Sequence, residues 1–368
     1  MKGVVDRIAV EAMYGEYPNI WFSNALYNGL MQYNPEENEL KYIAAFPEER
    51  SSQFFMHQTA AAYGSQIVFF PGQGSHIHIA DRHTWEIKTV PLDAWGPQGI
   101  GKIVRAFVVE RRIFLLPENL RNGMFLFHPE ECRMETVKID IEKIPLPNGC
   151  QPQAMFRNAC LYKDAIYAPL DNTEHIVKID LRTLRADIMD FKAGNAAEIE
   201  IVNGVMWILP GQGNQVFCRN MENGHMEAYT FDRETGTGRI FNNIVPVAHG
   251  IVLLPAKGKY IYFLREGKAV PVFKGEFLVS ADNEIIAFCF RNYMLQEDKV
   301  FVLPYKYRQS IVIDTDMHCK VSEPLRLADE VREKLTKEIL DDALNVGVTI
   351  GEEEFYSVSD FISKIEKG

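Results

Sequence analysis

The chain has 368 residues, of which 47% are apolar and 24% are charged, a composition typical of a folded protein with a substantial core. Its 39 lysines and arginines are outnumbered by 50 aspartates and glutamates, so the net charge is −11. This balance argues against nucleic acid as a partner, because binding to a phosphate backbone requires a basic surface.

The N-terminal sequence predicts a soluble, cytoplasmic protein. Asp6 and Arg7 stand where a signal peptide needs an apolar core, and no stretch approaches the roughly 20 apolar residues of a membrane span. The six cysteines are scattered and form no CxxC pair, so we expect buried thiols rather than a zinc or dithiol site. We therefore expect no membrane partner and no cofactor.

One pattern is repeated seven times along the chain. An apolar strand ends, usually at a proline, and a short polar loop leads to the next strand. Proline ends a strand because it has no amide hydrogen to donate to a neighbour. The closing positions lie between 41 and 52 residues apart. A repeat of this length that is built of short strands is typical of a β-propeller. The closing positions are Ser23 in the first copy, then Pro71, Pro117, Pro169, Pro210, Pro255 and Pro304.

The second and fourth copies predict what one blade contains. Each has four strand-like segments, and the corner before the last one has a similar sequence in both copies, DRHT at residues 81–84 and DLRT at residues 180–183. We therefore expect an all-β fold, a seven-bladed β-propeller with four-stranded antiparallel blades. The expected strands are residues 54–63, 66–70, 76–80 and 85–90 in copy two, and 154–161, 165–169, 175–180 and 185–191 in copy four.

Three short runs carry a resemblance to known propellers. The run NIWFS at residues 19–23, with GLMQYNP at residues 29–35, resembles a streptogramin-lyase repeat, and VMWILP at residues 205–210 is similar at its start. Over roughly residues 1–325 the chain resembles the seven-bladed propellers of the kelch, NHL and streptogramin-lyase groups. The resemblance implies the scaffold. A lyase mechanism would also imply a divalent metal, although the catalytic His and Glu of that family have no matching positions here.

The pattern changes after residue 324, so we expect a propeller domain over residues 1–324 and a helical tail over residues 325–368. Apolar residues at spacings of three and four predict an amphipathic helix from about residue 325, and a second short helix begins near Ser357 or Ser359. The tail either packs on the ring as a lid or docks a partner protein.

The inner strands of a propeller line its central channel, so polar residues in those strands are candidate site residues. Counting back twelve positions from the closing proline gives Arg105, Arg157, Glu198 and Asn243. The remaining copies have less certain turns, and their candidates are His57 or Thr59, Arg291, and Asp6 or Arg7.

These residues favour an anionic ligand. Two arginines suit a carboxylate, a phosphate or an acidic sugar, which a guanidinium grips with two hydrogen bonds. His57 and Glu198 are the catalytic candidates, as a general acid and base. In the alternative, purely structural interpretation, the arginines and the glutamate pair with one another across neighbouring blades.

Loops on one face of the ring form a second candidate surface. The tetrapeptide PGQG occurs at residues 71–74 and again at 210–213, which makes Gln73 and Gln212 candidate ligand-binding residues. His175 and Arg308 are further ligand-binding candidates in neighbouring loops. The rest of this polar and aromatic rim is Asn119, Arg121, Asp171, Asn172, Lys257, Lys259, Tyr305 and Tyr307.

His76 and His78 alternate along one strand, a spacing that metal sites use. No third ligand lies near them in the sequence, so the sequence predicts a hydrogen-bonded pair and no metal.

Two functions remain open. The first is a binding module that presents its rim and channel mouth to a protein, a peptide or a glycan. The alternative is a lyase or hydrolase acting on an anionic small molecule or sugar at the channel mouth. Whether the protein is an enzyme is left open by the sequence, which contains no recognisable catalytic motif.

Overall fold

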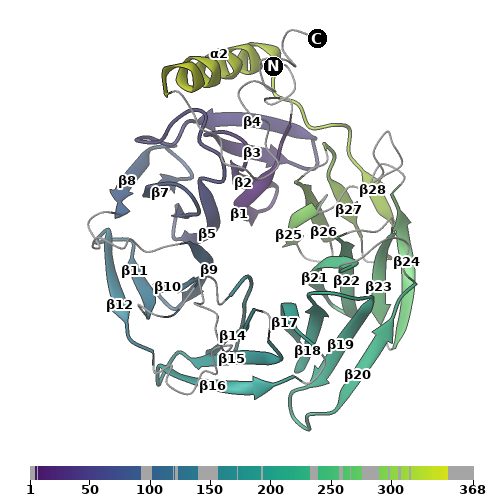
Figure 1. Cartoon of the computed structure of the whole chain (residues 1–368). Coiled ribbons are helices and arrows are strands. Elements are labelled where there is room, and N and C mark those ends of the chain that lie inside the picture. Colours follow the sequence, from purple (N-terminus) through teal and green to yellow (C-terminus); the bar gives the residue numbers. More distant parts are fainter. Residues whose placement is uncertain are drawn as a thin grey trace.

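The computed structural model shows a ring of seven four-stranded antiparallel sheets with a helix outside it (Figure 1). Within each sheet the strands pair in chain order, and the first strand of each blade lies nearest the centre of the ring (Figure 1). The seven-bladed propeller predicted from the sequence is confirmed. The structure describes residues 5, 7–92, 102–118, 120, 123–139, 156–171, 173–191, 194–232, 239–256, 260–265, 267–275, 290–296, 299–305, 308–314 and 316–346, with side chains to residue 342.

The blades follow one another around the ring. Blade 1 is β1 (Val10–Glu16), β2 (Asn19–Asn24), β3 (Leu30–Asn34) and β4 (Glu39–Ala44). Blade 2 is β5 (His57–Tyr63), β6 (Gln66–Pro71), β7 (His76–Asp81) and β8 (Ile87–Pro91). Blade 3 is β9 (Ile103–Val109), β10 (Arg112–Pro117), β11 (Met124–His128) and β12 (Arg133–Val137). Blade 4 is β13 (Cys160–Tyr162), β14 (Ala165–Pro169), β15 (His175–Asp180) and β16 (Arg185–Asp190).

The remaining three blades complete the ring. Blade 5 is β17 (Ala196–Val202), β18 (Val205–Pro210), β19 (Gln215–Asn220) and β20 (Met226–Thr230). Blade 6 is β21 (Phe241–Val247), β22 (Gly250–Pro255), β23 (Tyr260–Arg265) and β24 (Lys268–Lys274). Blade 7 is β25 (Phe290–Gln296), β26 (Lys299–Pro304), β27 (Ile311–Ile313) and β28 (Cys319–Val321).

The closing prolines end the second strand of six blades, as the repeat predicts. Pro71, for example, ends β6 and lies opposite His57, the first residue of β5. In blade 1 the equivalent residue is Asn24, which ends β2 and lies opposite Val10. The sequence alignment placed Ser23 there, so the first copy was out of register by one residue.

A β-bulge recurs at the start of the inner strands. In blade 2 the register passes from His57 to Thr59, so Gln58 is an extra residue between two paired ones. The same break occurs in the inner strands of blades 1, 3, 5, 6 and 7. An unpaired residue bends its strand and redirects its side chain, and here the bulge places one additional side chain from each strand at the channel.

Seven hydrophobic clusters hold the described part of the ring together, one at each junction between neighbouring blades. At the junction of blades 2 and 3, Phe70 packs edge-on against Phe127 with ring centroids 5.6 Å apart. The second strands are almost wholly buried because they pack against a neighbouring blade on both faces. This packing fixes the inner strands relative to one another.

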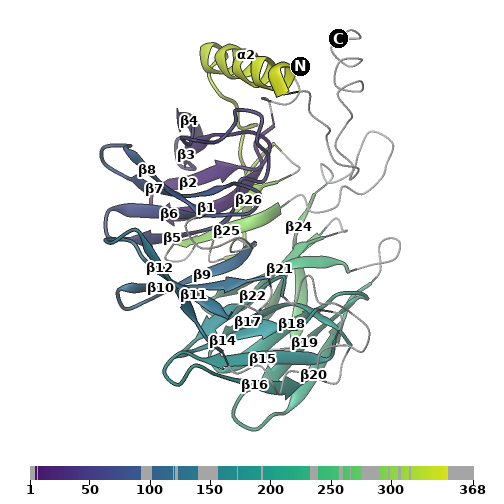
Figure 2. The ribbon, with the colours of Figure 1, turned by 60° about the vertical axis from the view of Figure 1, so that its left-hand side comes forward.

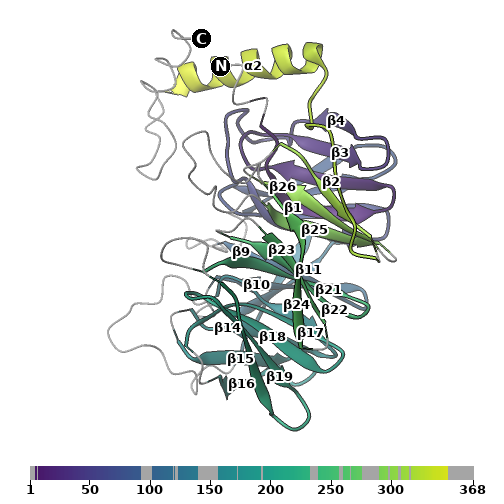
Figure 3. The same ribbon diagram turned by 90° about the vertical axis from the view of Figure 1, so that its right-hand side faces the viewer.

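The helix α2 (Asp329–Val346) lies outside the ring beside blade 1 (Figures 1 and 3). Leu335 and Ile339 pack into the cluster that joins blades 1 and 7, and Ser52 donates from its hydroxyl and amide to the Asp342 carboxylate at 2.6 and 2.9 Å. Figure 2 shows α2 beyond β3 and β4. The first predicted helix thus packs on the outer edge of the ring, and the second lies outside the described residues.

Among the residues that the structure describes, no helix combines the length and apolar character needed to cross a membrane.

Candidate functional site

A cavity of about 740 Å³ occupies the mouth of the central channel. Every blade contributes to it, and we call it the channel-mouth pocket. The residues of the inner strands and their approaches that line it are Glu11, Phe55, Gln58, Lys102, Val104, Arg105, Phe156, Arg157, Asn158, Asn195, Ala197, Glu198, Arg239, Asn242, Asn243, Arg291 and Asn292. Those that follow the second strands are Glu118, Asp171, Gly211, Gln212, Ala256 and Tyr305.

The bulge explains which residues face the pocket. All seven residues thirteen positions before a closing residue line it: Glu11, Gln58, Val104, Phe156, Ala197, Asn242 and Arg291. Five residues one position later also line it: Arg105, Arg157, Glu198, Asn243 and Asn292. The structure therefore brings together Arg105, Arg157, Glu198, Asn243 and Arg291, which the sequence analysis named from different blades.

Positive charge exceeds negative charge in the pocket. Its lining carries five cationic side chains, Lys102, Arg105, Arg157, Arg239 and Arg291, and four acidic ones, Glu11, Glu118, Asp171 and Glu198. Five minus four gives a formal charge of +1, in a chain whose net charge is −11. The pocket is thus a local exception to the acidity of the molecule.

Arg291 is committed to an ion pair that joins blade 7 to blade 1. Its Nη1 donates to both carboxylate oxygens of Glu11, at 2.9 and 3.0 Å, and its guanidinium lies 5.4 Å from the ring centroid of Tyr305. Glu11 is only 4% exposed, and this burial raises the pKa of its carboxyl. The cross-blade pairing considered in the sequence analysis therefore occurs at this position.

Arg105 and Arg239 instead hydrogen-bond to neutral amides. Arg105 Nε donates to Asn158 Oδ1 at 2.9 Å, and Arg239 Nη2 donates to Asn242 Oδ1 at 2.7 Å. These contacts orient the guanidinium groups, and the Glu198 carboxyl lies close enough to interact with both charges. Burial lowers the pKa of Arg239, a direction that reflects how much of its water shell has been removed.

Arg157 is the most accessible of the pocket arginines. Its side chain is 68% exposed, and its Nε donates to Asp171 Oδ2 at 2.9 Å within the same blade. Water screens such a pair, so Arg157 lies at the wet edge of the pocket.

Glu198 is the titratable acid of the pocket. Burial raises its pKa to about 7, although Arg105, Arg239 and a 3.4 Å hydrogen bond from Asn243 act in the opposite direction. Burial likewise raises the pKa of Glu200, two residues further along β17, to about 7. A carboxyl with this pKa is partly protonated at neutral pH, so it can donate or accept a proton there.

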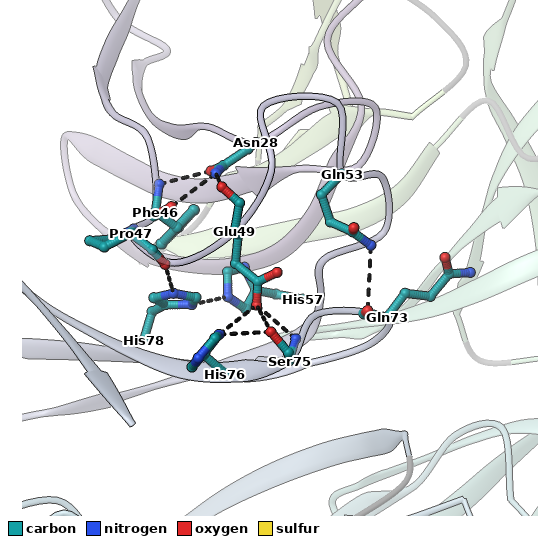
Figure 4. Close-up of polar contacts among 10 residues, drawn as sticks. All are labelled: Asn28, Phe46, Pro47, Glu49, Gln53, His57, Gln73, Ser75, His76 and His78. Atoms are coloured by element: carbon teal, nitrogen blue, oxygen red, sulfur yellow. Dashed lines mark hydrogen bonds and ion pairs between the residues drawn. The ribbon is translucent and has the colours of Figure 1, made fainter. Parts of the chain in front are cut away.

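His57 does not face the pocket. The bulge at Gln58 turns the His57 side chain to the opposite side of the strand, where the residue is 1% exposed. Its Nδ1 lies 2.9 Å from Ser23 Oγ. Its Nε2 lies 2.8 Å from His78 Nδ1, a contact that Figure 4 shows. Burial lowers the pKa of His57 well below its ordinary value. Of the two catalytic candidates, the structure therefore places Glu198 in the lining of the pocket and His57 outside it.

The other predicted ligand-binding residues divide between the pocket and the surface. Gln212 lines the pocket, whereas Gln73 is exposed in its loop and is not part of the lining. His175 pairs with Asp190 at 2.9 Å between β15 and β16, away from the channel, and Arg308 is exposed beside the tail. Of the candidates predicted from the sequence, the following lie outside the described residues: Asp6, Asn119, Arg121, Asn172, Lys257, Lys259 and Tyr307.

The repeated PGQG tetrapeptide has a structural explanation. The amide of Gly72 donates to Met56 O and that of Gly211 to Asn195 O, both at 2.8 Å. A Cβ at Gly72 would lie 2.7 Å from the Phe55 carbonyl oxygen, so only glycine allows this approach. The motif therefore holds its loop against the approach to the inner strand.

Sequence reasoning missed several pocket residues. Glu11 lies thirteen positions before Asn24, and Asn242 lies thirteen positions before Pro255. Counting back twelve positions passes over both residues, because each lies in a bulge that the repeat does not mark. Arg239 and Lys102 precede their strands, where no repeat position marks them.

The fold is shared with known propellers. No family model matches the chain, and no curated protein matches its sequence. YCF48 bound to D1 peptide is similar in structure with a TM-score of 0.60 and 10% identity, over 81% of this chain and 89% of that one. A streptogramin B lyase is similar with a TM-score of 0.57 and 12% identity, over 82% of this chain and 91% of that one. The extracellular domain of a putative hybrid two-component system from B. thetaiotaomicron is similar with a TM-score of 0.56 and 11% identity, over 81% of this chain and 39% of that one. Identities this low show the scaffold alone.

Proposed function

We propose that this propeller is a binding module whose channel-mouth pocket receives an anionic group of a peptide or protein partner. The observation that carries the proposal is the convergence of five cationic side chains from blades 3, 4, 6 and 7 on one cavity. Its volume of about 740 Å³ lies within the range of ligand pockets. A pocket of this size holds a few residues of an extended chain.

The charges of the pocket favour a carboxylate or phosphate. Arg105 is oriented by the neutral Asn158 amide, and a guanidinium in a fixed orientation grips a planar anion with two parallel hydrogen bonds. Partial protonation of Glu198 near neutral pH makes the lining more positive than its formal charge. An acidic side chain, a C-terminal carboxylate or a phosphorylated side chain meets these requirements.

The partner we favour is a peptide segment. The related fold of YCF48 binds the D1 peptide, which supports the use of such a ring for peptide recognition. A glycan remains the other class of ligand compatible with a polar, aromatic rim.

Peptide selection followed by substitution of Arg105 tests the proposal. A displayed random-sequence library is selected on the untagged protein, and the recovered peptides are resynthesised for calorimetry. We expect acidic peptides, and R105A to weaken their binding at least ~10-fold through the lost bidentate contact. R133A is the matched control, because Arg133 lies on β12 and pairs with Glu131. Recovery of neutral peptides, or equal binding by R105A, would contradict the proposal, and a hit only on a glycan array would replace the peptide by a glycan.

A lyase or hydrolase acting on an anionic small molecule is the second candidate. The specific observation in its favour is Glu198, a carboxyl whose pKa of about 7 places it close to neutral pH in a pocket with Arg105. On this hypothesis E198Q abolishes turnover in a substrate screen while R133A retains it. Turnover unchanged by E198Q would exclude Glu198 as the acid or base.

A further inference from the structure

Three metal-ligating side chains meet at the junction of blades 1 and 2 (Figure 4). His76 and His78 alternate along β7, so both face the same side. Glu49 lies in the segment between β4 and β5 and approaches them from blade 1. One ligand atom from each residue lies within 4.8 Å of the other two. Glu49 is distant from both histidines in the chain, so the local sequence gives no sign of a third ligand.

The carboxylate of Glu49 and the imidazole of His76 have the spacing of neighbouring ligands in a tetrahedral site. Ligands at ordinary zinc–nitrogen and zinc–oxygen distances lie ~3.3 Å apart. Glu49 Oε1 and His76 Nδ1 are 3.1 Å apart. Two imidazoles and one carboxylate are a ligand set that zinc accepts, with the fourth position left to water.

His78 is already held in the orientation of a metal ligand. Its Nε2 lies 2.9 Å from the carbonyl oxygen of Pro47, which can only accept, so Nε2 carries the hydrogen. Nδ1 is therefore the ring nitrogen that carries no hydrogen, and it has the electron pair that a metal ion would take. Donation of the second N–H to a backbone carbonyl is the arrangement that typically orients a metal-bound histidine.

The bond that now occupies His78 Nδ1 can be released. His57 Nε2 donates to it at 2.8 Å, and His57 Nδ1 accepts from the hydroxyl of Ser23 at 2.9 Å. A hydroxyl accepts as readily as it donates. When a cation takes the electron pair of His78, the hydrogen on His57 moves from Nε2 to Nδ1, the Nδ1–H group then donates to the Ser23 oxygen, and the Ser23 hydroxyl hydrogen turns away from His57.

Blade 4 provides an internal comparison. The segment HIH at residues 76–78 of blade 2 corresponds to HIV at residues 175–177. His175 pairs with Asp190 at 2.9 Å, as His76 pairs with Glu49 at 3.1 Å, but Val177 takes the place of His78. Both blades thus have a histidine paired with a carboxylate. Of these two blades, only blade 2 has a second imidazole beside it.

We propose that Glu49, His76 and His78 bind a divalent transition-metal ion of the zinc class. The ion would fasten the segment between blades 1 and 2 to β7. That segment also carries Phe55, which lines the channel-mouth pocket, so the ion would fix one wall of the pocket. The proposal stands independently of what the pocket binds.

Metal content of the untagged, full-length protein tests the proposal. The protein is stripped with EDTA, reloaded with zinc chloride, desalted, and analysed for zinc and protein. We expect one zinc per chain and a higher melting temperature than that of the stripped protein. H76A and E49Q should lose zinc affinity by more than the ~10–100-fold typical of changes around a metal ligand. H175A should retain the wild-type ratio.

A second measurement remains informative if a variant fails to fold. Zinc added to the wild-type protein should shift the imidazole NMR signals of His76 and His78 and leave those of His175 unchanged. A wild-type protein that retains no zinc and shows no such shifts would overturn the proposal. Folded H76A and E49Q proteins that bind zinc as tightly as the wild type would overturn it as well.

Discussion

At the scale of single residues, burial gives the pocket its chemistry. Burial raises the pKa of the Glu198 carboxyl to about 7 despite two neighbouring arginines. His57 shows the opposite case. Gln58 separates His57 from Thr59, and the bulge at Gln58 directs the His57 side chain into the protein, where it contacts Ser23 and His78.

Glu198 should limit stability at alkaline pH. Its pKa is raised from 4.5 to about 7 in the folded state, so the folded protein binds this proton more tightly than the unfolded chain does. Stability therefore falls as pH rises through this interval, and E198Q should be more stable than the wild type by on the order of 1–2 kcal/mol at about pH 8 and equal to it near pH 4. Urea unfolding at both pH values checks this. E135Q, on the exposed outer strand β12, is the control, and a pH-independent effect of E198Q would contradict the account.

At the scale of elements, the repeat predicted more than the individual strands. The prolines located the end of the second strand in six blades, because the missing amide stops the ladder at the same place each time. Glu11 was missed because Asn24 replaces proline in blade 1 and a bulge adds one residue to β1. Glu49 was missed because only the packing of blade 1 against blade 2 brings it to His76. Neither effect leaves a local signal in the sequence.

The helix α2 should contribute to stability through its buried face. Leu335 is 2% exposed and packs into the cluster between blades 1 and 7. L335A should lower the free energy of unfolding by about 2–4 kcal/mol, the usual cost of a cavity at a buried leucine. K337A, at an exposed position of the same helix, should change it by less than about 0.5 kcal/mol. Equal effects of the two substitutions in denaturant unfolding would show that the helix does not pack as described.

At the scale of the whole molecule, the ring concentrates positive charge in an acidic protein. Every blade contributes residues to the pocket, six of them through a bulged residue, so differences among the seven copies meet in one cavity. The uniform parts of the repeat build the scaffold, and the non-uniform positions give the pocket its charge. The sequence could predict that these positions differ, but not that Arg291 is neutralised by Glu11 while Arg105 is held by an amide.

The central claim is that the pocket recognises an anionic group through Arg105. A double-mutant cycle between the protein and a selected acidic peptide tests it most directly. Calorimetry gives the affinities of the wild-type protein and R105A for the acidic peptide and for the same peptide with the acidic group replaced by an amide. The account predicts that the amide peptide binds the wild-type protein at least ~10-fold more weakly, and that R105A no longer distinguishes the two peptides. Equal affinities of both peptides for the wild-type protein, or discrimination that survives R105A, would contradict it.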